Sequence, residues 1–178
     1  MNKVLYSEEE IALQVQQLAA QISDYYAPRV SIAEPLVLLP VLKGAFIFSA
    51  DLVRQLTVPV RVEFLRASSY RSGTVSGALE LDIPGASALR GQHLLILEDI
   101  IDTGKTVSQI LMALRACEPA SLQICALLDK PARRVSAIEL AFCGLTIAGD
   151  RFVIGYGMDL AERYRELPYV GEIDTCTF

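Results

Sequence analysis

Apolar residues recur along the chain in two periods, one typical of helices and one typical of strands. Ile11, Val15 and Leu18 repeat at helical spacing behind a Ser-Glu-Glu-Glu sequence at residues 7–10, which has the pattern of a capping box. Further helices are predicted at about residues 45–56 and directly after Gly104. Alternating positions or short apolar runs predict strands at residues 35–42, 58–70, 93–98, 122–128, 140–143, 151–156 and 169–173.

This alternation of strands and helices predicts an α/β fold with a mainly parallel sheet and helices on both faces, because parallel strands need crossover connections. With 178 residues the chain fits a single domain, residues 1–178. Ligands of such sheets bind beyond the carboxyl ends of the strands. Residues 43–44, 98–106 and 129–130 carry polar chemistry, and each segment follows an apolar strand. They therefore predict one common site.

Composition and charge restrict the classes of protein that fit. With 52% hydrophobic and 21% charged residues, the chain is expected to fold. No apolar run approaches the ~18 residues of a membrane helix, and the N-terminal residues lack a signal-peptide pattern, so we expect a cytoplasmic protein with no membrane partner. The net charge of −5 disfavours nucleic acid as a partner. Residues 71–78 are rich in Gly and Ser and are expected to form a mobile loop.

The four cysteines give no sign of a metal centre. They are widely spaced, without a C-x-x-C pair, and the chain has one histidine, so a zinc site is not expected. Cys125 and Cys143 lie in apolar runs and are interpreted as inert buried thiols.

The most informative stretch is residues 94–106, LLILEDIIDTGKT, in which a strand leads through three acids into a helix. Free N–H groups at the start of that helix, with the hydroxyls of Thr103 and Thr106, suit a phosphate group. Glu98 and Asp99 suit sugar hydroxyls and hydrated Mg²⁺, because carboxylates accept hydrogen bonds and are hard oxygen ligands. The stretch therefore favours a ribose 5-phosphate.

Two other interpretations of this stretch fit less well. A P-loop would need Gly at position 99, where the chain has Asp, so the nucleoside triphosphatase interpretation fails. A purely structural interpretation, with Asp102 as a helix N-cap among solvated acids, leaves unexplained why three acids and two threonines meet at one junction.

Residues 94–106 resemble the phosphoribosyl pyrophosphate signature of type I phosphoribosyltransferases, an apolar strand followed by Glu-Asp, two apolar residues and Asp-Thr-Gly-x-Thr. Within that superfamily the chain resembles hypoxanthine-guanine phosphoribosyltransferases from about residue 36 to 171. The segments that carry this second resemblance are Leu42-Lys43-Gly44, Leu128-Asp129-Lys130-Pro131 and the stretch from Phe152 to Asp159.

The resemblance implies a core of about residues 36–150 and a small hood formed by the chain-terminal segments, about residues 1–35 and 151–178. It also implies an Mg²⁺-dependent enzyme of purine salvage. Such an enzyme moves ribose 5-phosphate from phosphoribosyl pyrophosphate (PRPP) to hypoxanthine or guanine, giving IMP or GMP. Family members are usually oligomers, so a homodimer or homotetramer is expected.

Residue roles follow from the same resemblance. Asp102 is expected to lie beside N7 of the purine as the catalytic base or proton partner. Lys130 is expected to donate to the purine O6, which would make adenine a poor substrate. The other expected contacts to substrates are Lys43, Gly44 and Arg165 for pyrophosphate, Glu98 and Asp99 for ribose, Thr103, Gly104, Lys105 and Thr106 for the 5-phosphate, Phe152 and Val153 for the base, and Ser69 and Tyr70 on a closing flap. The expected Mg²⁺ ligands are Glu98, Asp99 and Asp159.

Alternatives remain for single residues and for the whole chain. Lys105 fits a solvent-pointing side chain equally well, and Phe152 alone could belong to the core. A transferase for a pyrimidine or for xanthine is a second enzyme interpretation. A phosphoribosyltransferase-like regulator that binds nucleotide or RNA is a different class, which the acidic chain disfavours.

Overall fold

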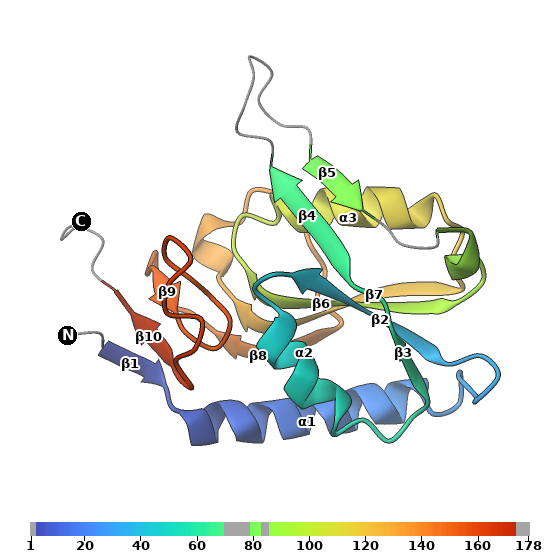
Figure 1. Ribbon diagram of the computed structural model, residues 1–178, viewed down its shortest axis with the longest axis horizontal. Coiled ribbons are helices and arrows are strands. Elements are labelled where there is room, and N and C mark those ends of the chain that lie inside the picture. The colour runs from blue at the N-terminus through green and yellow to red at the C-terminus, as the bar shows by residue number, and fades with distance from the viewer. Residues whose placement is uncertain (1–2, 70–78, 83–85, 174–178) are drawn as a thin grey trace, which may run out of the picture.

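The computed structural model describes residues 3–69, 79–82 and 86–173, which form a large sheet with helices on both faces and a smaller sheet beside it (Figure 1). The helices are α1 (Glu8–Tyr26), α2 (Phe46–Val53) and α3 (Lys105–Arg115), with 3-10 turns η1 (Ala86–Leu89) and η2 (Pro131–Arg133). The strands are β1 (Lys3–Tyr6), β2 (Leu36–Leu42), β3 (Val60–Val62), β4 (Leu65–Ser69), β5 (Leu79–Asp82), β6 (His93–Ile101), β7 (Ser121–Asp129), β8 (Phe142–Thr146), β9 (Val153–Ile154) and β10 (Val170–Glu172). None of the helices described is both long and apolar enough to cross a membrane.

The large sheet confirms the expected α/β fold. Its strand order is β5-β4-β2-β6-β7-β8, and β3 also pairs with β2. Every pair in it is parallel except β4 with β5. Because β2, β6 and β7 run in the same direction, their carboxyl ends meet at one edge of the sheet.

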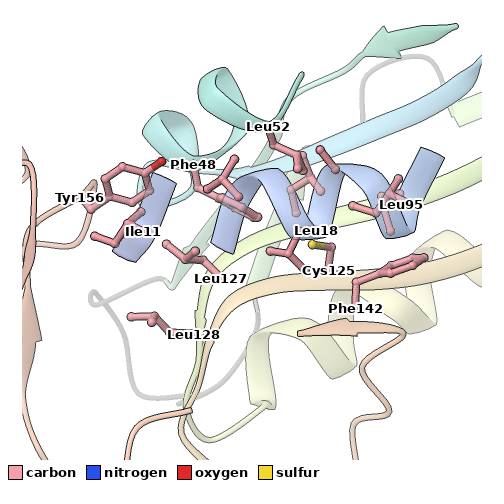
Figure 2. Packing of buried hydrophobic residues seen from close by; sticks show 14 of the residues in the cluster. Ile11, Leu18, Phe48, Leu52, Leu95, Cys125, Leu127, Leu128, Phe142 and Tyr156 are labelled. Atoms are coloured by element: carbon pink, nitrogen blue, oxygen red, sulfur yellow. The ribbon is translucent and has the colours of Figure 1, made fainter. Parts of the chain in front are cut away.

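Two apolar layers cover the two faces of this sheet. Leu95 and Leu97 of β6 pack in one cluster with residues of α1 and α2, part of which is shown in Figure 2. Leu94 and Ile96, which point the other way, pack against α3 in a second cluster. Burial on both faces explains why β6 reads as a continuous apolar run and not as an alternation.

Helix α1 begins at the predicted capping box. The Ser7 hydroxyl accepts from the Glu10 backbone N–H at 3.2 Å, and the Glu10 carboxylate accepts from the Ser7 N–H at 2.7 Å. The apolar stripe of the helix, which includes Ile11, Val15 and Leu18, is fully buried. The segment predicted as part of the hood, residues 1–35, divides between the two sheets. Strand β1 joins the small sheet, whereas α1 packs against helix α2 and against β8 of the large sheet.

The small sheet has the order β1-β10-β9 and joins segments from both ends of the chain, as expected for the hood (Figure 1). Its pairs are antiparallel. After β9 the chain turns back toward α2, where the Tyr156 hydroxyl donates to the Asp51 carboxylate at 2.6 Å. This hydrogen bond ties the hood to the helix that follows the Lys43-Gly44 turn.

Several predicted element bounds were wrong, each for a local reason. Strand β1 was not predicted, because four residues carry too little periodicity to be recognised without their partner β10. The strand predicted at 58–70 is interrupted between β3 and β4, which pair with different parts of β2. The strand predicted at 151–156 is reduced to β9, which ends at Ile154 because Gly155 and Tyr156 have positive φ.

Strand β5 was not predicted either. The other differences are small. The helix predicted at 45–56 ends at Val53, and the strand predicted at 140–143 begins at Phe142. The predicted Gly/Ser-rich loop at residues 71–78 lies outside the described residues.

Candidate active site

A cavity of about 420 Å³ lies at the carboxyl ends of β2, β6 and β7. It collects predicted site residues from five separate segments of the chain. Those that line it are Lys43, Gly44, Glu98, Asp99, Asp102, Thr103, Gly104, Thr106, Lys130, Phe152, Val153, Asp159 and Arg165.

Glu98 and Asp99 form a buried acidic pair near the end of β6. Glu98 is only 7% exposed, and burial raises its pKa well above the ordinary value, with a further contribution from the Asp99 charge. Burial also raises the pKa of Asp99. Gly44 packs so closely on this pair that a Cβ there would overlap the Asp99 carboxylate. The Lys43-Gly44 turn, entered through a cis peptide bond from Leu42, therefore covers the acids directly.

This acidic pair fits a divalent cation. Within the described part of the chain, neither Glu98 nor Asp99 takes part in an ion pair with Lys or Arg, so their charge is left for a ligand to neutralise. No group of three His, Cys, Asp or Glu side chains gathers among the described residues as a metal site. A hard cation bound by this pair could complete its coordination with oxygen ligands from water or from a substrate.

Asp159 lies apart from that pair, on the loop after β9. Its carboxylate is 2.8 Å from Arg165 and accepts from the Glu162 backbone N–H at 2.8 Å. Arg165 also donates to the Gly157 carbonyl oxygen at 2.7 Å. Asp159 is thus held by protein groups on two sides.

An anion cradle lies at the start of α3. Gly104 caps the helix in the left-handed region, with φ of 80° and without a side-chain cap. The Lys105 N–H donates to the Thr103 hydroxyl at 3.4 Å, a long contact that a bound anion could replace. Thr103 and Thr106 line the cavity beside it. Lys105 is exposed and is not among the lining residues, in agreement with the solvent-pointing alternative. The alternative that Asp102 is the helix N-cap is wrong, because Gly104 occupies that position.

Among the described residues, one carboxylate oxygen of Asp102 has a partner and the other has none. Its Oδ2 is 3.3 Å from Arg133 Nη1, while its Oδ1 is buried without a hydrogen-bond partner among the described residues. Arg134 fixes the backbone here, because its guanidinium donates to the carbonyl oxygens of Ile101 and Asp102 and pairs with Asp129. An unsatisfied acceptor in a cavity is available to a proton donor on a bound ligand.

Lys130 follows β7 directly, and its backbone N–H donates to the Ile101 carbonyl oxygen at 3.0 Å. Its side chain is 4% exposed, and its ammonium is 2.8 Å from Asp150. Phe152 lines the cavity two residues after Asp150 and is 39% exposed, which excludes the alternative of a core residue. A fixed ammonium and an exposed aromatic ring are suited to bind the edge and the face of a planar base.

Comparison with known proteins identifies the family of this site. A family model described as a phosphoribosyl transferase domain matches residues 1–163. The chain belongs to the phosphoribosyltransferase family. Hypoxanthine phosphoribosyltransferase of Haemophilus influenzae is 42% identical over 173 residues, covering 96% of this chain and 94% of that protein. Hypoxanthine-guanine phosphoribosyltransferase of Bacillus subtilis is 38% identical over 179 residues, covering 100% and 96%.

A solved structure agrees with these relatives. Hypoxanthine phosphoribosyltransferase of Trypanosoma cruzi, in a mutant form and as a ternary substrates complex, superposes on this phosphoribosyltransferase with a TM-score of 0.89 and 38% identity. The match covers 97% of this chain and 95% of that one.

Two predicted flap residues of this phosphoribosyltransferase cannot be placed in the site. Ser69 ends β4, with no side chain described, and Tyr70 lies outside the described residues. Conversely, the structure adds Arg133 and Arg151 to the cavity wall, neither of which was predicted as a site residue. A charged residue in a short polar segment carries no periodic signal, so nothing in the local sequence distinguished them from solvated side chains.

Proposed function

We propose that this phosphoribosyltransferase acts in purine salvage, transferring ribose 5-phosphate from PRPP to hypoxanthine or guanine and releasing pyrophosphate. The observation that carries the proposal is the meeting, in one cavity, of an anion cradle, a buried acidic pair and a buried lysine. Relatives that are 38–44% identical over nearly the whole chain bear the names of hypoxanthine and hypoxanthine-guanine phosphoribosyltransferases, which supports the same substrates.

In this reaction the bond from ribose C1 to the pyrophosphate oxygen breaks and a bond from C1 to a purine nitrogen forms. The N-terminus of α3, with Thr103 and Thr106, would hold the 5-phosphate and so fix the sugar. Glu98 and Asp99 would accept hydrogen bonds from the ribose hydroxyls, and their negative charge would stabilise the cationic sugar of the transition state.

Asp102 would accept the proton that the purine loses. Its unpartnered Oδ1 is the available acceptor, while Arg133 holds Oδ2 at 3.3 Å. An acid whose second oxygen is fixed in this way can take up a proton at one defined atom, as general base catalysis requires.

Mg²⁺ is the proposed cofactor, because the uncompensated charge of Glu98 and Asp99 suits a hard cation. When bound, the ion would neutralise the charge of the pyrophosphate leaving group. Asp159 is proposed as a further ligand; it would have to exchange its present contact with Arg165 for the ion, directly or through water.

Lys130 is the proposed determinant of base specificity. An ammonium donates hydrogen bonds and accepts none, so it suits a 6-keto oxygen and opposes the 6-amino group of adenine. Phe152 would stack on the base, and the backbone of Val153 would contact its edge.

The pyrophosphate would bind between the Lys43-Gly44 turn and Arg165. Lys43 is 2.9 Å from Glu162, which also lies 3.4 Å from Arg165, so a carboxylate already bridges the two proposed cations. Ser69 and Tyr70 are proposed as the pair on a flap that closes over the site and excludes water.

The protein is further proposed to be cytoplasmic and to form a homodimer or homotetramer. The regulatory nucleotide- or RNA-binding alternative is not favoured, because the residues expected to act on substrate gather in one cavity and the names of the relatives are those of enzymes.

The test is the Mg²⁺-dependent conversion of hypoxanthine, guanine, xanthine and adenine to nucleotides with PRPP. The wild type should use hypoxanthine or guanine and discriminate against adenine. Lys130→Met should lose this preference, whereas Asp102→Asn should lower kcat by about 10²–10⁴-fold with all bases. Binding of PRPP without turnover of any base would contradict the proposal and favour the regulator.

A further inference from the structure

Asp150 holds the lysine that faces the base. The Lys130 side chain is only 4% exposed, and the Asp150 carboxylate 2.8 Å away is the one anion paired with it among the described residues. A charged amine removed from water is stable only beside a counter-charge. The two residues come from different parts of the fold, since Lys130 follows β7 and Asp150 precedes β9.

The same carboxylate reaches a second cation. Arg133 Nε lies 3.6 Å from Asp150, and Arg133 Nη1 lies 3.3 Å from Asp102. Alternating charges therefore run from Lys130 through Asp150 and Arg133 to Asp102. This row joins the two side chains that are proposed to contact N7 and O6, which are neighbouring atoms on one edge of the purine.

We propose that Asp150 is a positioning residue that fixes the Lys130 ammonium as a donor toward the 6-keto oxygen, and so sets the preference for 6-oxopurines over 6-aminopurines. The inference rests on the proposed function. An ammonium has three N–H donors, so one toward Asp150 leaves others for the base. The hydrogen bond from Lys130 lowers the pKa of Asp150, which keeps its carboxylate charged at neutral pH.

The substitution Asp150→Asn removes the counter-charge and keeps the shape of the side chain. Lys130 then gains by turning away from its buried position, and the fixed donor is lost. We expect the KM for hypoxanthine to rise about tenfold while the KM for PRPP stays unchanged, because Asp150 is itself 67% exposed and the loss is smaller than for a fully buried pair. The ratio of kcat/KM for hypoxanthine to that for adenine should fall with it.

Three further variants separate positioning from general damage. Asp150→Glu keeps the charge and should restore most of the hypoxanthine KM. Glu118→Gln breaks a comparable exposed ion pair, 2.6 Å from Arg90 and remote from the cavity, and should change nothing. In a Lys130→Met background, Asp150→Asn should have no additional effect on the KM for hypoxanthine, because the residue through which it acts is gone.

A second measurement needs no activity. The chain has four lysines, Lys3, Lys43, Lys105 and Lys130, so ¹H–¹⁵N spectra of the lysine ammonium groups can be assigned with single variants. A buried, hydrogen-bonded ammonium exchanges its protons slowly, so Lys130 should give a signal in the wild type and in Glu118→Gln, and lose it in Asp150→Asn.

The two measurements distinguish the failure of each proposal. An inactive wild type whose Lys130 signal depends on Asp150 would overturn the proposed function and support the positioning of the lysine. An active wild type in which Asp150→Asn leaves both the signal and the hypoxanthine KM unchanged would overturn the role of Asp150. An effect of Asp150→Asn that persists without Lys130 would also overturn it, because that effect would not pass through the lysine.

Discussion

Glu98 is a residue at which function and stability oppose each other. The residue is 7% exposed next to Asp99, and burial raises the pKa of its carboxyl group well above the ordinary value, so its charge disfavours folding. Glu98→Gln removes that charge and keeps an amide that can donate to Asp99. We expect the free energy of unfolding of the Mg²⁺-free protein to rise by about 1 kcal/mol while transferase activity is lost.

Urea unfolding followed by circular dichroism measures the first effect, and the nucleotide assay measures the second. Glu34→Gln, at an exposed acid, provides the control and should leave both unchanged. A Glu98→Gln protein less stable than the wild type would contradict the interpretation that the buried charge destabilises the fold.

Glu162 occupies the place that is proposed for the pyrophosphate. Its carboxylate contacts both Lys43 and Arg165, and the hydrogen bond from Lys43 lowers its pKa. Because PRPP must replace this carboxylate, Glu162→Gln should lower the KM for PRPP, by about two- to fivefold for so exposed a pair. Initial rates at varied PRPP concentration measure this KM, and Glu166→Gln on the same loop is the control. An unchanged or higher KM in Glu162→Gln would show that the Glu162 carboxylate does not compete with PRPP.

These residue-scale features differ in how far the sequence predicted them. Glu98, Asp99 and Asp102 were found because three acids between an apolar strand and a helix form a local pattern. Asp150 and Glu162 were not, because their partners are Lys130 and Lys43, and Lys43 is 119 positions from Glu162. A pairing of this kind leaves no local pattern.

At the scale of elements, the turn after β9 and the Lys43-Gly44 turn fit against each other without side chains. A Cβ on Gly157 would overlap the Gly44 carbonyl oxygen, and φ at Gly157 is 100°. Gly149 has a φ of 74° but open space around it. The two glycines thus share the backbone requirement and differ in packing.

The two alanine substitutions separate these effects. Gly149→Ala should cost about 1 kcal/mol, from the left-handed backbone alone. Gly157→Ala should cost several kcal/mol more and should raise the KM for PRPP, because the clash displaces the turn that covers the acidic pair. Thermal unfolding and initial rates would measure both; equal losses of stability would show that the contact between the turns contributes nothing.

Strand and helix bounds show which elements their own sequences specify. α1 begins at the predicted residue because its cap and its apolar stripe are both local. β1 and β9, with four and two residues, exist through their pairing with β10 and were missed or misjudged. An element is thus predicted well where its own residues bury enough apolar surface, and poorly where a distant partner supplies the hydrogen bonds.

At the scale of the whole molecule, ligand binding and stability should be coupled through the acidic pair. Glu98 and Asp99 offer two protein ligands, and the third proposed ligand, Asp159, is paired with Arg165. We therefore expect Mg²⁺ alone to raise the Tm little and Mg²⁺ with PRPP to raise it clearly. A ligand at 100 times its Kd stabilises by about 2.7 kcal/mol. Thermal shift measurements test this. An Asp99→Asn protein should lose most of the rise in Tm that Mg²⁺ and PRPP produce together. If Mg²⁺ alone produced that whole rise, the protein would contain a complete metal site.

The sequence by itself determined the α/β class, the strand-to-helix junction that is proposed to bind phosphate, and the side chains at the ends of β2, β6 and β7, because each of these depends on neighbours within one or two elements. The tertiary structure alone decided how the hood meets the core. It placed Asp150 on Lys130, Glu162 between two cations, and Tyr156 on Asp51 across 105 positions of the chain. Such contacts depend on where the fold brings distant segments together, and local spacing of apolar and polar residues carries no record of that.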